Sequence, residues 1–304
     1  MKLNQLRALV CVHETGSLQE ASAVLHLTQS AVSRTIKELE SDVGLALVQR
    51  SNKGMTLTES GQRLLMYARQ TLETVRRAKQ EMDDLKGLAA SEVTLGVTPV
   101  TALLGTVKQA LVAFQRHHPR SALKIIELRP SVLLQHLRDG LLDVAVTSHL
   151  PAVTTGMDWQ LQERLPGVVV VREGHDLATA DSLRTLHNTL WVSVDPLADQ
   201  ESQFNRTFDN NALVRPANVI ECTAMNLALK LLRETDAAMV MCGAALESDR
   251  DAWTGSPMNL RVLPVREALP DYPISLVCLD RHRLSRIAEH LYAFLEGAAR
   301  VARA

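Results

Sequence analysis

The sequence predicts a chain in two parts, an all-α N-terminal segment with a small hairpin and a C-terminal α/β domain. Three observations predict this division. Residues 17–40 fit two short amphipathic helices joined by a tight turn, residues 59–86 carry apolar side chains at heptad spacing, and strand patterns alternate with helical ones from residue 93 onward. With 304 residues, the chain is long enough for about two domains.

The first short helix has a clear start signal. Ser17 is the expected N-cap, Glu20 completes an S-x-x-E capping box three residues later, and Gly16 supports the turn before them. One face of this helix comprises Leu18, Ala21, Ser22 and Leu25. The small residues on that face let a second helix cross closely after a turn at His26 and Leu27.

The second short helix, which Thr28 is expected to cap, has two different faces. Its buried stripe comprises Val32, Ile36 and Leu39. The opposite face carries Ser30, Ser33, Arg34 and Lys37 at i, i+3, i+4 and i+7, with Gln29 in the first turn. Hydroxyl, amide and guanidinium groups contact base edges and phosphates. We therefore predict a helix-turn-helix that places this face in the DNA major groove, with an ordinary solvated face as the alternative.

A small hairpin follows. Residues 46–50 and 55–57 look like two short strands around a turn at 51–54. Lys53 at its tip and Arg50 at its flank make it a wing that could reach the minor groove or the DNA backbone. A structural ion pair of Arg50 is an equally good interpretation.

Many of these residues agree with one known pattern at fixed spacing: Gly16, Ser17, Ala21, Leu25, Thr28, Gln29, Ser30, Ala31, Val32, Ser33, Ile36, Leu39, Glu40, Gly44, Leu47, Arg50, Leu57, Thr58 and Gly61. The pattern covers about the first 65 residues and resembles the N-terminal signature of LysR-type transcriptional regulators. Val48 departs from it, because the family usually has Phe there, but Val keeps the position apolar. The resemblance implies a winged helix-turn-helix at residues 1–58, with DNA contacts from Gln29, Ser30, Ser33, Arg34 and Lys53.

A long helix is expected from Glu59 to about Lys86, capped by Thr58. Two seams recur at seven-residue spacing: Gly61, Ala68, Val75 and Met82, and Leu64, Thr71, Ala78 and Leu85. Such seams predict packing on a partner helix. Packing within the chain is the alternative. We expect a homodimer, because the N-terminal segment offers this helix no other core, and a dimer would place two recognition helices ~34–36 Å apart.

Beyond a small-residue linker at 87–91, strands alternate with helices. The expected strands are 93–97, 123–128, 144–147, 168–171, 190–193, 214–220, 238–241, 260–263 and 274–279, and the expected helices include 103–116, 131–139 and 224–233. This alternation predicts an α/β domain with a mainly parallel sheet.

The family resemblance implies more about this region. Residues 59–87 would be the dimerisation linker helix, and residues 88–304 an effector-binding domain with two lobes, similar to periplasmic binding proteins. Lobe one would cover about 88–165 and 268–304, ending in a helix at 286–302, and lobe two about 166–267. The resemblance also implies that two dimers pair into a homotetramer.

Polar groups lie where the expected strands end and helices begin, which is where ligands of parallel α/β domains bind. These positions are Thr98, Pro99, Val100, Thr101, Thr147, Ser148, Ser193, Thr223, Met241 and Gly243. Hydroxyls and free N–H groups suit a carboxylate or sulfonate, so we expect a small organic anion in the cleft between the lobes. The alternative is that each hydroxyl only caps a helix. For Thr98 and Thr101 together we expect ligand contact.

Charge distribution supports the DNA hypothesis. Residues 1–79 hold 11 Lys and Arg against 7 Asp and Glu, a net charge of +4, whereas the remaining residues hold 22 against 27, a net charge of −5. The basic excess therefore falls on the expected DNA-binding head. Aromatic residues make up only 3% of the chain, which disfavours a protein that binds single strands by stacking.

Several function classes are disfavoured. The N-terminus does not fit a signal peptide, and no stretch reaches the ~18 apolar residues of a membrane span, so we expect a cytoplasmic protein without membrane contact. Cys11, Cys222, Cys242 and Cys278 are scattered and are expected to be buried, with a Cys222–Cys242 disulfide as the alternative. No phosphate-binding loop, nucleophile motif or metal-ligand spacing occurs, so we expect no cofactor, no metal and no enzyme activity. The helices of residues 1–86 argue against a simple solute-binding protein.

Overall fold

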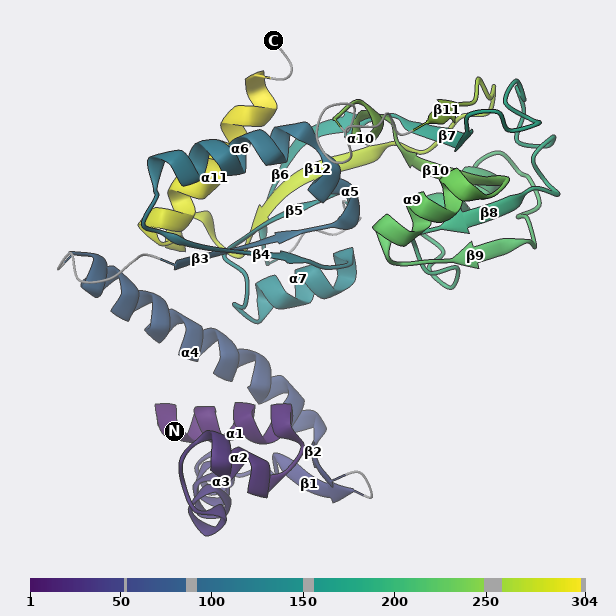
Figure 1. Ribbon diagram of the computed structural model, residues 1–304. Helices are drawn as coiled ribbons and strands as arrows, with labels where there is room; N and C mark the ends of the chain where they lie inside the picture. The colour runs from purple at the N-terminus through teal and green to yellow at the C-terminus, as the bar shows by residue number, and fades with distance from the viewer. Residues whose placement is uncertain (52–53, 86–91, 150–155, 249–258, 302–304) are drawn as a thin grey trace.

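The computed structural model describes residues 1–51, 54–85, 92–149, 156–248 and 259–301. It consists of a small N-terminal head, a long helix and an α/β domain with two sheets (Figure 1). Among the described residues, no helix combines the length and the apolar composition that a membrane crossing requires.

The head contains α1 (Leu3–Thr15), α2 (Leu18–Val24), α3 (Gln29–Val43), β1 (Val48–Ser51) and β2 (Gly54–Leu57). The Ser17 hydroxyl accepts hydrogen bonds from the N–H groups of Gln19 and Glu20, and the Thr28 hydroxyl accepts one from the N–H of Ala31. Both predicted caps are therefore confirmed. The predicted stripe of α3 (Val32, Ile36 and Leu39) is buried in the head's core, which positions the opposite face outward.

The predicted hairpin is confirmed, with its first strand two residues later than expected. The Glu40 carboxylate holds it against α3 by accepting hydrogen bonds from the N–H groups of Leu47 and Val48, at 2.8 and 3.2 Å. Gly54 has a φ of +110°, and a Cβ there would lie 2.6 Å from the carbonyl oxygen of Gly16. Only glycine fits this close approach of the hairpin to the turn between α1 and α2.

The long helix is α4 (Glu59–Leu85), close to its predicted bounds and capped by the Thr58 hydroxyl, which accepts from the Gly61 N–H at 3.0 Å. The expectation that it finds no core in the N-terminal segment is wrong. Leu65 and Ala68 are buried in the head's core, where α4 packs on α1. The predicted linker at 87–91 lies outside the described residues.

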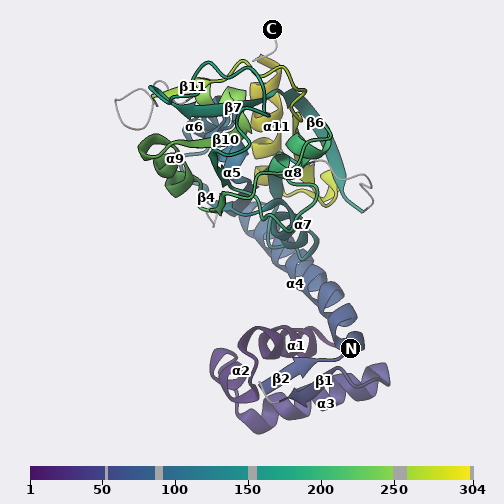
Figure 2. The ribbon, with the colours of Figure 1, turned by 90° about the vertical axis from the view of Figure 1, so that its right-hand side faces the viewer.

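The first sheet of the α/β domain, with its helices, forms lobe one. Its strands are β3 (Glu92–Val97), β4 (Ala122–Glu127), β5 (Val144–Thr147), β6 (Asp158–Leu165) and β12 (Tyr272–Cys278), in the order β4-β3-β5-β12-β6. The helices are α5 (Pro99–Leu103), α6 (Gly105–His117), α7 (Pro130–Arg138), η1 (Arg281–Arg283) and α11 (Arg286–Val301). Helices α6 and α11 cover one face of the sheet, and α7 covers the face toward α4 (Figures 1 and 2).

The second sheet forms lobe two. Its strands are β7 (Gly167–Arg172), β8 (Leu190–Ser193), β9 (Val219–Glu221), β10 (Ala237–Cys242) and β11 (Leu260–Val262), in the order β11-β7-β10-β8-β9. The helices are α8 (Gln203–Asp209), α9 (Met225–Glu234) and α10 (Gly243–Ser248). The chain passes from the first sheet to the second between Leu165 and Gly167 and returns between Val262 and Tyr272.

The expectation of a mainly parallel sheet is wrong. In the described part of each sheet, two strand pairings are parallel and two are antiparallel. The cause in lobe one is β12, which returns from lobe two and runs antiparallel to both β5 and β6. The parallel pairs still direct the ends of β3, β5 and β8 toward one region between the lobes, where the candidate ligand site lies.

Candidate DNA-binding face and interlobe cavity

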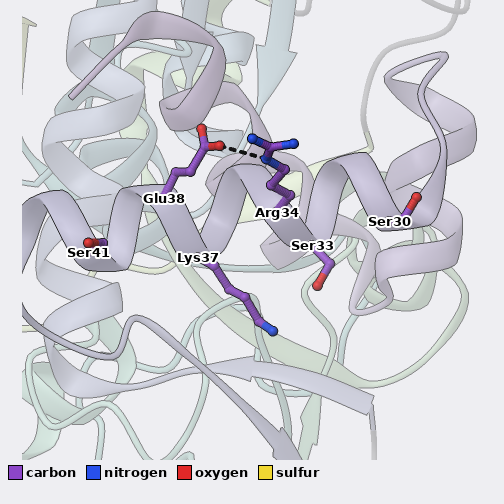
Figure 3. A pocket seen from close by; sticks show the side chains of 6 residues that line it. All are labelled: Ser30, Ser33, Arg34, Lys37, Glu38 and Ser41. Atoms are coloured by element: carbon purple, nitrogen blue, oxygen red, sulfur yellow. Dashed lines mark hydrogen bonds and ion pairs between the residues drawn. The ribbon is translucent and has the colours of Figure 1, made fainter.

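The outward face of α3 presents a row of polar side chains to solvent. The side chains of Ser30, Ser33, Arg34, Lys37, Glu38 and Ser41 line one shallow hollow along the helix (Figure 3). Arg34 is 82% exposed and pairs with Glu38 one turn later, at 3.0 Å. An exposed pair of this kind contributes only about 0–1 kcal/mol, so the guanidinium can exchange Glu38 for another anion at little cost.

The other predicted DNA contacts on this helix lie on the same accessible side. Gln29 and Lys37 are exposed, and Ser33 is half-buried. The Ser30 hydroxyl lies 3.0 Å from the hydroxyl of the capping residue Thr28. The structure thus brings Gln29, Ser30, Ser33, Arg34 and Lys37 together on one open surface, with donors and acceptors suited to base edges and phosphates.

On the wing, Arg50 is exposed in β1. No charged group in the described ranges pairs with it, which disfavours the interpretation as a structural ion pair. Lys53, the expected contact at the tip, lies outside the described residues.

A cavity of about 500 Å³ lies between the two lobes. Lobe one contributes α5, α7 with the residue before it, the segment after β5 and the start of β12. Lobe two contributes the segment after β8 and the start of α8. The lining residues are Val100, Arg129, Pro130, Ser131, Leu134, Arg138, Ser148, His149, Val194, Asp195, Pro196, Asp199, Glu201, Ser202, Gln203, Arg206, Tyr272 and Pro273. The volume is typical of pockets that enclose small molecules.

The arginine side chains around this cavity lack ion-pair partners in the described part of the chain. The side chains of Arg129, Arg138 and Arg206 form no ion pair with any described residue. Among the acidic groups, Asp195 is the most enclosed, and burial raises the pKa of its carboxyl. Burial also raises the pKa of the Tyr272 hydroxyl, which stays protonated at neutral pH. The cavity therefore combines unpaired cations with hydrogen-bond donors and acceptors.

A contact network joins the α/β domain to the head through α4. The Arg69 guanidinium on α4 bonds to Asp139 at the end of α7, at 2.9 Å, and to Glu14 of α1, at 3.1 Å. The Gln70 side chain donates to the carbonyl oxygen of Arg138 at 2.9 Å. One side chain thus bridges three elements, and its partner Asp139 directly follows a helix that lines the cavity.

Two family comparisons cover most of the chain. Residues 3–62 match the family described as bacterial regulatory helix-turn-helix protein, lysR family, and residues 86–300 match the LysR substrate binding domain. The chain belongs to the LysR family. It is therefore a DNA-binding transcriptional regulator with an effector-binding domain, and not an enzyme.

Individual relatives agree with this assignment. The transcriptional regulator CfxR of Cupriavidus necator is 31% identical over 222 residues, which are 72% of this chain and 69% of CfxR. The transcriptional regulator TdcA of Escherichia coli K12 is 26% identical over 92% of this chain and 88% of TdcA. Among solved structures, the LysR family regulator CbnR has the same fold, with a TM-score of 0.68 at 18% identity, over 98% of this chain and 99% of CbnR.

In this LysR-type regulator, the predicted effector positions separate into three groups. Val100 and Ser148 line the cavity. Thr98 and Thr101 are almost fully buried behind its wall and bond to one another and to β5. The remaining predicted positions, Pro99, Thr147, Ser193, Thr223, Met241 and Gly243, do not line the cavity in the described part of the chain.

Sequence reasoning missed the charged residues of the regulator's cavity, although a signal was present. Arg129 directly precedes α7 after β4, and Asp195 follows β8. Both follow strands, as the predicted positions do, but the prediction rested on hydroxyls and free N–H groups and not on charged side chains. Arg206 gives no such signal, since it lies inside α8.

The four cysteines of the regulator are buried free thiols. Burial raises the pKa of the Cys242 thiol to about 11, so it is protonated at neutral pH and a poor nucleophile. The predicted burial is confirmed, and the alternative of a Cys222–Cys242 disulfide is not what the structure contains.

Proposed function

We propose that this regulator binds operator DNA as a homodimer through the exposed face of α3, and that a small organic anion in the interlobe cavity changes its DNA geometry. The observation that carries the proposal is the exposed row of Gln29, Ser30, Ser33, Arg34 and Lys37, held on a helix whose other face is locked into the head's core. Such a helix enters the major groove without rearrangement of the head.

The wing supplies further DNA contacts in this proposal. Arg50 is exposed without an ion-pair partner among the described residues, so its guanidinium is available for a phosphate or the minor groove. Lys53 is proposed as the contact at the tip. These cations position the head on the duplex, and the side chains of α3 select the sequence.

The homodimer is proposed to form along α4. Tyr67 and Met82 are large apolar residues on this helix with 65% and 49% exposure, and burial against a second copy would remove them from water. The solved structures include CbnR complexed with its target DNA. In this proposal two dimers also pair into a tetramer, and the protein is cytoplasmic, where bacterial DNA lies.

The effector is proposed to be an anion because Arg129, Arg138 and Arg206 line one cavity without ion-pair partners. Val100 and Ser148 are the predicted positions that would touch it directly. An effector that shifts α7 would also shift Asp139, which Arg69 of α4 holds, and Arg69 in turn contacts Glu14 in the head. The result is a shift between two arrangements of the dimer with different spacing of the half-sites.

To test DNA binding, the purified protein first selects binding sites from genomic DNA fragments. Fluorescence anisotropy then measures its affinity for a selected site. Arg34→Ala should weaken binding to a selected site about tenfold or more, because a guanidinium fork on guanine is worth about 1–3 kcal/mol. The matched control is Arg283→Ala, which also removes one exposed Arg with an acidic partner, but on the α/β domain. Wild-type affinity of Arg34→Ala would contradict the proposed face.

A further inference from the structure

The wall of the interlobe cavity contains a hydrogen-bond acceptor with spare capacity at Gln203. The Gln203 side-chain N–H group donates to the carbonyl oxygen of Asp271 at 3.1 Å, which fixes the orientation of the amide. The amide oxygen Oε1 is buried and accepts no hydrogen bond from the described residues. An unsatisfied buried acceptor costs about 1–3 kcal/mol. A ligand that donates a hydrogen bond here would recover that free energy.

The Asp195 carboxylate, which can also accept further hydrogen bonds, lies beside this amide. The Asp195 oxygen Oδ2 accepts a hydrogen bond from the backbone N–H of Gln203 at 3.2 Å, which places the two residues next to each other. No other described residue donates to this carboxylate. Burial raises the pKa of Asp195 and the nearby Asp199 raises it further, whereas the Gln203 N–H and His149 lower it. A bound cation would stabilise the ionised carboxylate.

The other charged side chains that line the cavity are the carboxylates of Asp199 and Glu201 and three arginines without ion-pair partners among the described residues. Arg129 and Arg138 stand at the two ends of α7 in lobe one, and Arg206 projects from α8 in lobe two. A simple carboxylic acid would pair with these arginines, but it would give no donor to the Gln203 oxygen and would leave the Asp195 carboxylate with the Gln203 N–H as its one donor among the described residues. A ligand with one carboxylate and one ammonium group would satisfy both sets.

We propose that the effector is a zwitterion, an amino acid or a close derivative, with its ammonium group on Asp195 and Gln203 and its carboxylate toward the arginines. This proposal rests on the proposed effector function of the cavity. Leu134, Val194 and Pro196 line the remaining wall and leave an apolar surface for the ligand's side chain. The acceptors belong to lobe two and Arg129 and Arg138 to lobe one, so a ligand of this kind would contact both lobes.

The test is a thermal-shift screen of the full-length protein with the proteinogenic L-amino acids, each at millimolar concentration, followed by calorimetry. Each amino acid is compared with its 2-hydroxy acid analogue, which keeps the carboxylate and replaces the ammonium group. We expect at least one amino acid to raise the melting temperature. Its hydroxy acid should bind about tenfold more weakly or worse, since a charged hydrogen bond is lost. If no amino acid binds, or if the hydroxy acids bind equally well, the proposal is wrong.

Variants locate the ammonium group. Asp195→Asn keeps the shape of the side chain and should reduce amino-acid affinity about tenfold, whereas Asp199→Asn, which removes an exposed carboxylate of the same cavity, should change it less than about threefold. Gln203→Met serves as a second variant, and circular dichroism verifies that each variant is folded. Equal losses of amino-acid affinity for Asp195→Asn and Asp199→Asn would overturn the placement of the ammonium group on Asp195. If only acids without an amino group bind, and Arg206→Ala abolishes that binding, the anion effector stands and the zwitterion is refuted.

Discussion

At the scale of single residues, Thr101 shows how the fold uses a polar side chain that follows a strand. Its hydroxyl accepts a hydrogen bond from the N–H of Thr98 at 2.9 Å and lies 2.9 Å from the carbonyl oxygen of Val146, to which it donates. Its side chain is 0% exposed. The sequence predicts this hydroxyl at the end of the strand, whereas in the structure β3 ends at Val97 and Thr101 lies in α5. The sequence does not reveal that β5 packs alongside and covers it.

Thr101→Val should therefore lower the free energy of unfolding by about 1–2 kcal/mol, because two buried hydrogen bonds are lost at nearly constant volume. The Val146 oxygen keeps a donor in the Thr98 N–H, at 3.3 Å, which limits the loss. Urea denaturation followed by circular dichroism measures the change. Ligand affinity and DNA affinity should stay close to those of the wild type. A variant with wild-type stability but impaired effector binding would instead place Thr101 in the ligand site.

At the scale of secondary-structure elements, periodicity predicted the helices well but not their partners. The heptad spacing gave the bounds of α4 closely, yet it placed Gly61 and Ala68 on a dimer seam. Both are buried within the head, because α4 begins by packing on α1 and β2. A seven-residue period indicates that one face of a helix is buried, but it does not identify the element that covers this face.

The strand missed from the sequence has a similar explanation. β6 (Asp158–Leu165) is an edge strand in which Trp159, Leu161 and Leu165 alternate with polar residues. Glu163 interrupts this apolar face and most of the side chains are partly exposed, which weakens the pattern that predicts strands. Its pairing with β12 depends on a chain segment more than a hundred residues later, which no local pattern encodes. The same long-range return makes the sheets mixed and not mainly parallel.

Gly61→Ala tests which effect is larger at this position, the higher helix propensity of Ala or the close packing of α4 on the hairpin. Helix propensity alone predicts that Ala stabilises this position by about 1 kcal/mol. A Cβ at Gly61, however, would lie 2.0 Å from the carbonyl oxygen of Leu47, so the helix must shift away from the hairpin. We expect a net loss of about 1–3 kcal/mol in the stability of the head, measured by thermal unfolding.

Gly297→Ala is the matched control for that substitution. Gly297 is also a helical glycine, in α11, and a Cβ there would meet no atom within 4 Å. This variant should gain about 0.5–1 kcal/mol. If both glycine variants gain stability, the close approach of α4 to the hairpin does not constrain the head.

At the scale of the whole molecule, α7 connects the candidate ligand cavity to the DNA-binding head. Leu134 and Arg138 of this helix line the cavity, and Asp139 directly after it is held by Arg69 of α4, whose guanidinium also contacts Glu14 of α1. Gly140 allows the close approach, because a Cβ there would lie 2.7 Å from the Glu73 side chain. In Figures 1 and 2, α7 accordingly lies between the sheet of lobe one and α4.

If this bridge couples the two parts, its removal should separate their unfolding. The double variant Arg69→Met with Asp139→Asn removes both charges at once, so that neither is left buried without its partner. We expect calorimetry to show one cooperative transition for the wild type. For the variant, the head should melt at a lower temperature, by roughly 4–8 °C for each kcal/mol of lost coupling, while the α/β domain keeps its melting temperature.

The control is Arg63→Met with Glu59→Gln, which removes an exposed ion pair of 2.9 Å on the same helix and should leave the single transition unchanged. A single transition in the Arg69 variant would show that the head and the effector domain are coupled through other contacts, and α7 would then have no privileged role in carrying the effector's signal to DNA.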